Sequence, residues 1–70
     1  MKCFFFEEDI FFFEEVEEVT PLLSTVSALS PFFFAVKTKR KTYYYFYKTE
    51  AEAQRAYGEF EKLLRRDTGK

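Results

Sequence analysis

The fold is decided by the stretch Lys41-Thr42-Tyr43-Tyr44-Tyr45-Phe46-Tyr47-Lys48-Thr49-Glu50-Ala51-Glu52. Its five consecutive aromatic residues favour a strand, because rings suit a pleated, half-buried surface and suit a helix poorly. Thr49 follows as a helix N-cap, and Glu52, three residues later, completes a capping box. The sequence therefore predicts a strand over Thr42–Tyr47 that passes directly into a helix over Thr49–Arg66.

The predicted C-terminal helix has one apolar stripe, which suits packing on one face of a sheet. The stripe consists of Ala53, Ala56, Tyr57, Phe60, Leu63 and Leu64. Gly58 falls on the opposite, solvent side, where glycine costs about 1 kcal/mol relative to alanine. Gly58 is therefore either sequence drift or a place where another chain approaches the helix.

Three further apolar runs predict strands, over Lys2–Phe6, Ile10–Phe13 and Phe32–Val36. The first two form a hairpin around Glu7-Glu8-Asp9, although this turn contains neither Gly nor Asn. The third forms a hairpin with Thr42–Tyr47 around the basic connection Lys37–Lys41. These pairings predict an antiparallel sheet of about four strands.

Residues 14–30 leave two interpretations open. Their apolar side chains recur every three or four positions, as in a helix, at Val16, Val19, Leu22, Leu23, Val26 and Leu29. Thr20 and Pro21 would cap and begin a short helix at about 21–29. The alternative extends the second strand through Val19 and adds an irregular loop. In both cases residues 1–70 form a single α+β domain with the C-terminal helix on one sheet face, in the order ββαββα if the short helix forms.

Composition limits the chemistry available to this chain. It has 70 residues, no His and one Cys, so it can form neither a zinc site nor an internal disulfide. No nucleophile–base pair of a familiar kind can be assembled either, and we expect a non-enzymatic protein without a cofactor. Cys3, near the start of an apolar strand, is expected to be buried.

The chain shows no sign of export or membrane insertion. Its N-terminal apolar run is interrupted by Glu7-Glu8-Asp9, and no apolar run approaches the ~18 residues of a membrane-spanning helix. A single cysteine is typical of a reducing compartment. We therefore expect a cytoplasmic protein that does not contact a membrane.

The predicted strands are apolar on both faces, since neighbouring residues of a strand point to opposite sides. Tyr44 and Phe46 lie on one face of the fourth strand, and Tyr43, Tyr45 and Tyr47 lie on the other. One helix covers only one face, so the short helix, a second copy or a ligand must cover the other. A homodimer is the first choice, because two-fold dimers are the commonest soluble oligomers. The primary hypothesis is a small protein-binding module of the adaptor or inhibitor type, self-associating through an aromatic sheet face.

The charges are divided between the two halves of the chain. Residues 1–36 contain one Lys and seven acidic residues, whereas residues 37–70 contain ten Lys or Arg and five acidic residues. Either the halves lie side by side and neutralise each other, or the basic half meets an anion. The second option gives the alternative hypothesis, a single-stranded nucleic-acid-binding protein. Its bases would stack on a tyrosine platform flanked by a basic tip, formed by Tyr43, Tyr45, Tyr47, Lys37, Lys39, Arg40 and Lys41.

Overall fold

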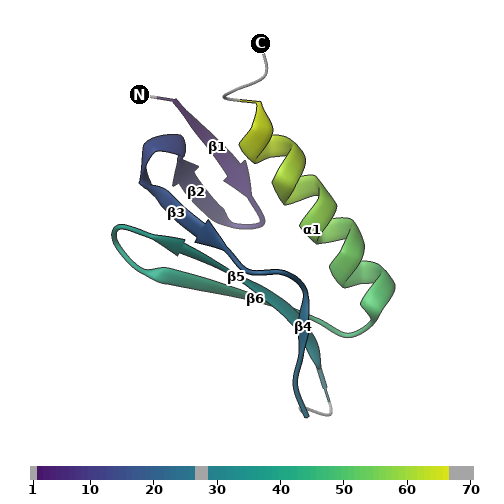
Figure 1. Ribbon diagram of the computed structural model, residues 1–70. Helices are drawn as coiled ribbons and strands as arrows, with labels where there is room; N and C mark the ends of the chain where they lie inside the picture. The colour runs from purple at the N-terminus through teal and green to yellow at the C-terminus, as the bar shows by residue number, and fades with distance from the viewer. Residues whose placement is uncertain (1, 27–28, 67–70) are drawn as a thin grey trace.

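The computed structural model describes residues 2–26 and 29–66 and shows an α+β fold, which confirms the predicted class (Figure 1). The elements in chain order are β1 (Cys3–Phe6), β2 (Asp9–Phe12), a 3-10 turn (Phe13–Glu15), β3 (Val16–Val19), β4 (Leu23–Ser24), β5 (Phe32–Thr38), β6 (Thr42–Tyr47) and α1 (Glu50–Arg65). Within these ranges the strands pair antiparallel, in one sheet of two strands and one of four. The helix α1 packs against β5 and β6 of the larger sheet and also contacts β1.

The predicted N-terminal hairpin is present as β1 and β2, and it forms the smaller sheet. Phe6 pairs with Asp9, which leaves Glu7 and Glu8 as a two-residue turn. Glu7 has φ 55°, the only positive φ of a non-glycine residue in the described ranges. Glycine is the residue that adopts this conformation without strain, so glutamate is an unusual choice here. The hairpin therefore forms because its strands pair and pack, and its turn carries no sequence signature.

The strand β5 is the centre of the larger sheet. Along one side it pairs with β6, in the register Phe33 opposite Phe46 and Phe34 opposite Tyr45. Along its other side it pairs with β3 and then with β4. This arrangement confirms the hairpin predicted from Phe32–Val36 and Thr42–Tyr47, and it makes β6 the last strand on its side of the sheet among the described strands.

The short helix predicted at about 21–29 is wrong for the described part of that range; residues 27–28 lie outside the described residues. Leu23 and Ser24 form a strand, and Val26 and Leu29 are exposed rather than lined up on a buried face. The three-residue spacing of Val16 and Val19 comes instead from a register shift in the β3–β5 ladder. An extra residue in a strand brings two side chains three positions apart onto one face, which imitates helical spacing.

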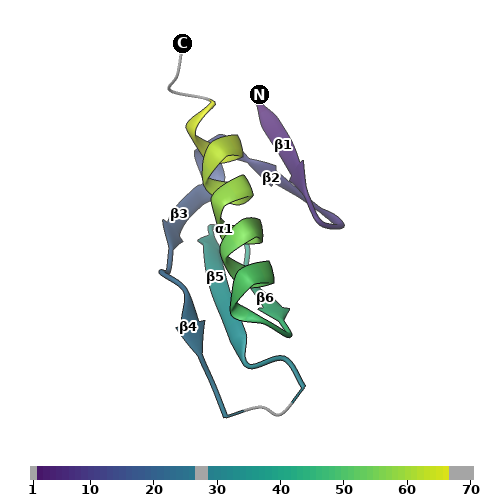
Figure 2. The ribbon, with the colours of Figure 1, turned by 90° about the vertical axis from the view of Figure 1, so that its right-hand side faces the viewer.

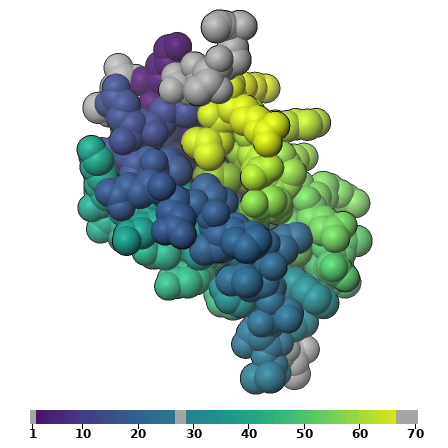
Figure 3. All heavy atoms as spheres, viewed as in Figure 1, coloured from purple at the N-terminus to yellow at the C-terminus, as the bar shows by residue number. Residues whose placement is uncertain are grey.

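The predicted extension of the second strand through Val19 is also interrupted, by the 3-10 turn at Phe13–Glu15. Thr20 ties the next segment to β5 at a single residue: its N–H donates to the carbonyl of Ala35, and its Oγ1 accepts from the N–H of Ala35. The whole connection from β3 to β4 thus runs along β5. In the space-filling view this segment crosses the front of the molecule and continues into a projection at the bottom (Figure 3).

The helix α1 begins as predicted, with Thr49 as its N-cap. The Thr49 Oγ1 accepts a hydrogen bond of 3.1 Å from the N–H of Glu52. Ala53 and Phe60 on the predicted apolar stripe are fully buried, while the other members of the stripe border the core. Figure 2 shows α1 in front of the larger sheet, with β3 and β4 on one side and the β1–β2 hairpin on the other.

The core is a cluster of aromatic rings around Phe60. Its ring centroid lies 5.2 to 5.9 Å from those of four other phenylalanines, Phe4, Phe6, Phe11 and Phe34. These rings come from the helix, from both strands of the hairpin and from the centre of the larger sheet. Edge-to-face and tilted ring contacts add about 0.5–1.5 kcal/mol per pair beyond the burial of area. The fold is therefore held together mainly by phenylalanine packing, and α1 and the hairpin share one face of the larger sheet.

Candidate functional site

The opposite face of the larger sheet carries large apolar side chains that no described element covers. Strand alternation and register bring them into neighbouring rows, with Leu23 and Phe46 on either side of Phe33, and Tyr44 opposite Ala35. Tyr44 is 60% exposed, Phe46 is 51% exposed and Leu23 is 42% exposed. We call Leu23, Phe33, Tyr44 and Phe46 the outer aromatic face.

Two rings of the outer aromatic face are already ordered against each other. The Phe33 and Phe46 centroids lie 5.0 Å apart, with 27° between the ring planes, across the β5–β6 ladder. Cross-strand aromatic pairs of this kind stabilise a sheet. The two stacked rings form one continuous apolar surface on this face.

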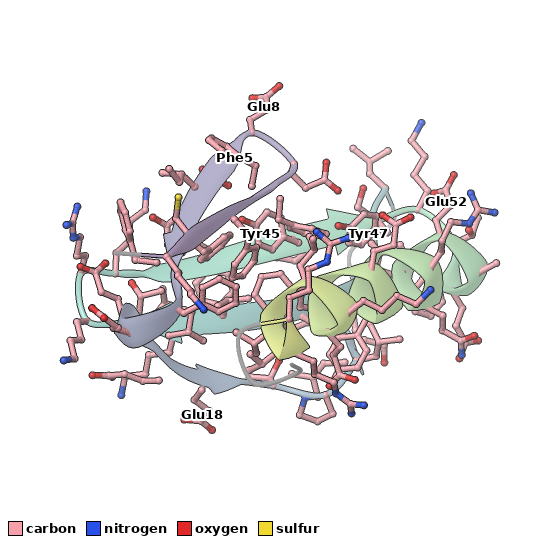
Figure 4. The ribbon with its side chains drawn as sticks, turned by 90° about the horizontal axis from the view of Figure 1, so that it is seen from above. Phe5, Glu8, Glu18, Tyr45, Tyr47 and Glu52 are labelled. Carbon is pink, nitrogen blue, oxygen red and sulfur yellow. The ribbon has the colours of Figure 1, made fainter. Side chains whose placement is uncertain are left out.

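The outward side of the β1–β2 hairpin is a second exposed apolar patch, which is not among the surfaces predicted from the sequence. Phe5 is 69% exposed and Ile10 is 41% exposed, and the two residues face each other across the hairpin. Phe5 points away from the body of the molecule in Figure 4. Cys3 lies on the same side and is exposed, so the expectation that it is buried is wrong. Its position two residues before Phe5 puts it on the outward row of β1.

The tyrosine triplet lies on the covered face of the larger sheet. Tyr45 is only 9% exposed, and its ring contacts those of Phe6 and Phe34 at centroid distances of 5.0 and 5.6 Å. Tyr43 and Tyr47 are half-buried at the two ends of the same row. Stacking of bases on all three rings would require Tyr45 to leave this packing. The arrangement therefore gives no support to the predicted tyrosine platform.

The hydroxyl groups of this row bind carboxylates of the hairpin turn. Tyr45 donates to Asp9 at 2.7 Å, and Tyr47 donates to Glu7 at 3.0 Å. Burial raises the pKa of both tyrosines above the usual value of 10.0, and the hydrogen bond to a carboxylate raises each further. Both residues therefore act as neutral hydrogen-bond donors that hold the hairpin against β6, and Figure 4 shows them between the hairpin and α1.

The basic tip between β5 and β6 is partly neutralised by the acidic half of the chain. Arg40 forms an ion pair of 3.2 Å with Glu15, and the backbone position opposite Lys37 in the β3–β5 ladder is that of Glu18. The Lys41 ammonium lies 4.6 Å from the centre of the Tyr43 ring. The two halves thus lie side by side at this end, as the first interpretation of the charge division predicted. All four cations of the tip, Lys37, Lys39, Arg40 and Lys41, are exposed.

The conformation of the basic tip is set by the buried side chain of Thr38. Its Oγ1 accepts hydrogen bonds from the N–H groups of Arg40 and Lys41, and its hydroxyl donates to the carbonyl of Lys41. A threonine that binds the backbone of its own turn replaces the glycine that such turns often need. The tip is therefore an ordered structural turn.

Gly58 lies on the exposed side of α1, as predicted, and a Cβ atom built on it would meet nothing within 4 Å. The structure does not bring it together with the basic tip, since α1 and the β5–β6 turn lie at opposite sides of the molecule (Figure 1). The space around Gly58 neither favours nor excludes the approach of another chain.

Two lysines in the sequence indicate that Tyr44 and Phe46, rather than Tyr45, lie on the exposed face of the sheet. Lys37 belongs to the same row of β5 as Phe33 and Ala35, and Lys48 continues the row of Tyr44 and Phe46. Charged residues mark the solvent side of a strand. These lysines therefore identify the outer aromatic face.

Two other features are absent from residues 2–26 and 29–66. This part of the chain contains no group of three or more His, Cys, Asp or Glu residues placed to hold a metal ion. It also contains no helix with the length and apolar character needed to cross a membrane. Comparison of the chain with protein-family models, curated proteins and solved structures finds no match.

Proposed function

We propose that this chain is a small, non-enzymatic protein-binding module that self-associates through its outer aromatic face. The observation that carries the proposal is the exposure of Tyr44 and Phe46, at 60% and 51%, on the sheet face opposite α1 and the hairpin. Large apolar patches on a small domain mark interaction surfaces more often than they mark bare surface.

The size of the domain favours a second copy as the occupant of this face. A chain of 70 residues buries only about 60% of the surface that its unfolded form exposes, so association adds stability that the core alone cannot supply. A stable interface of standard size buries about 800 Å² of accessible surface on each partner. The accessible surface of this protein is 5094 Å² in total, which leaves room for such an interface. A two-fold dimer would place the Phe33–Phe46 stack of one copy against that of the other and would bury both.

The free thiol of Cys3 supports a reducing compartment as the place of action. An exposed cysteine in an oxidising compartment would be open to intermolecular disulfide formation or to oxidation. We therefore infer a cytoplasmic protein.

The mass in solution, measured by size-exclusion chromatography with light scattering, tests self-association. The wild-type chain is expected to be a dimer, and Phe46→Ser is expected to be a folded monomer because it removes half of the central ring stack. Phe5→Ser is the matched control, since it removes a more exposed phenylalanine from the hairpin patch and should leave the dimer intact. A monomeric wild-type chain would contradict self-association. Dissociation caused by Phe5→Ser alone would move the interface to the hairpin.

A further inference from the structure

The outer edge of β6 is an unpaired strand edge among the described strands. Among the described strands, β6 pairs with β5 alone, so its other edge offers unpaired backbone N–H and C=O groups. Natural proteins commonly guard such edges with Pro, a charged side chain or a bulge. The six residues of β6, Thr42–Tyr47, include neither Pro nor a charged side chain, and their ladder with β5 is regular.

An acidic groove lies along this edge. It has a volume of about 310 Å³ and is lined by the hairpin turn, Glu7–Asp9, and by Tyr44–Tyr47 of β6. The hydrogen bonds from Tyr45 to Asp9 and from Tyr47 to Glu7 hold the turn over the strand. Figure 4 shows the hairpin crossing above the larger sheet, with Glu8 at its tip on the side opposite Glu18.

The charges of the groove are one-sided. Its lining contains three carboxylate side chains and no Lys or Arg. Glu8 is exposed at the tip, while Glu7 and Asp9 each accept one hydrogen bond from a neutral tyrosine, which does not neutralise them. A cationic side chain that enters the groove is therefore attracted by three carboxylates of the hairpin turn.

We propose that the free edge of β6 binds an extended segment of a partner protein in which Lys or Arg alternates with apolar residues, and that the segment adds a strand to the larger sheet. Backbone hydrogen bonds to β6 would hold the segment. Alternate side chains of an added strand point to opposite faces, so one set would lie beneath the acidic turn. The other set would continue the outer aromatic face beside Tyr44 and Phe46.

The acidic turn disfavours a second copy of this chain as the occupant. Antiparallel pairing of β6 with its own copy would bring two turns with the same three carboxylates onto the same side of the joined sheet, near the two-fold axis. Like charges placed together in this way select against the wrong partner. The edge and the outer aromatic face are thus separate surfaces, and this inference does not depend on the proposed self-association.

The test uses the full chain labelled with 15N and a short, end-blocked peptide in which lysine alternates with valine. Saturable shifts of the Thr42–Tyr47 amide signals are expected, and β3 amides should not move. The same peptide N-methylated at every residue has no backbone N–H on either edge, so it cannot pair as a strand and should not bind. Glu8→Lys should weaken binding by roughly threefold to tenfold, because it replaces an exposed attraction by a repulsion. Glu18→Lys makes the same change on the opposite side and should have no effect.

Three results would overturn the inference. The first is equal binding of the N-methylated peptide, which would reduce the effect to charge attraction. The second is equal weakening of peptide binding by Glu8→Lys and by Glu18→Lys. This result would assign the binding to the overall negative charge of residues 1–36. The third is a fall in solution mass when the peptide is added, which would show that a second copy already occupies the edge. In the first two cases the solution mass of the protein does not change. Failure of the inference about the β6 edge can therefore be told apart from failure of the proposed self-association.

Discussion

The hydroxyl of Tyr45 donates a 2.7 Å hydrogen bond to the carboxylate of Asp9, which lies 36 positions earlier in the chain. Tyr45 belongs to β6 of the larger sheet, and Asp9 begins β2 of the smaller sheet. The bond therefore joins two sheets that share no backbone ladder. It also aligns the acidic turn with the edge of β6, so it contributes both to stability and to the shape of the groove.

Removal of the Tyr45 hydroxyl should destabilise the fold without disturbing its packing. Tyr45→Phe keeps the ring among Phe6 and Phe34, but it leaves the Asp9 carboxylate without this partner. We expect the free energy of unfolding in urea to fall by about 1–2 kcal/mol. Tyr47→Phe is the comparison, because its bond to Glu7 is exposed, and it should cost less than about 0.5 kcal/mol. Equal losses for the two variants would contradict this assignment.

Stability should fall in alkaline solution. Burial raises the pKa of Tyr45, Tyr47 and Tyr57, and hydrogen bonds to carboxylates raise each further. Unfolded tyrosines lose their protons near pH 10.0, while these three keep theirs in the folded protein. Above that pH the unfolded state binds fewer protons, so the free energy of unfolding decreases as pH rises. Below it the stabilisation by these groups is fully present and does not change with pH. Urea unfolding across this range should show a flatter decline in the Tyr45→Phe variant.

Relief of strain at the hairpin turn should stabilise the protein. Glu7 has φ 55°, a conformation that costs a residue with a Cβ about 1 kcal/mol and that glycine adopts freely. In a Tyr47→Phe background, where the Glu7 carboxylate has lost its partner, Glu7→Gly should raise the free energy of unfolding by about 1 kcal/mol. Glu8→Gly is the matched control and should lower it, since Glu8 has no positive φ. A fall in the free energy of unfolding caused by Glu7→Gly in this background would show that the turn is not strained.

A methyl group at Gly58 distinguishes the two interpretations of this glycine. The site is open, so Gly58→Ala should raise the free energy of unfolding by about 0.5–1 kcal/mol through helix propensity. If Gly58 is sequence drift, the mass in solution will stay the same. If another copy approaches the helix here, the variant will be more stable as a monomer but will associate less, as measured by light scattering.

The elements that the sequence predicts well are those whose signals are local. Thr49 and Glu52 define the start of α1 within a single turn, and the rings of Thr42–Tyr47 favour a strand whatever lies around them. The connection from Val16 to Leu23 depends on β5 instead. A register shift and the paired hydrogen bonds of Thr20 to Ala35 create it. The register shift leaves a spacing that imitates a helix, and the hydrogen bonds leave no pattern in the sequence.

The candidate surfaces were predicted only in part. Because the strands are apolar on both faces, the sequence predicts that one aromatic face of the sheet stays uncovered. Which face that is depends on which row of side chains packs against α1 and the hairpin. Tyr45 is covered because Phe34 opposite it packs on Phe60, a contact between elements that are far apart in the sequence. The groove along β6 could not be predicted, because it requires the crossing of the hairpin over that strand.

The separation of the two sheets has a consequence for the exchange of backbone amide protons with solvent. In the described residues, side-chain rings and the two tyrosine–carboxylate bonds attach the hairpin to the larger sheet, and no strand ladder does so. The hairpin can therefore open as a unit while β5 stays paired with β3, β4 and β6. Deuterium should enter the amides of β1 and β2 well before those of β5, and ring packing rather than hydrogen bonding should set the interval between them.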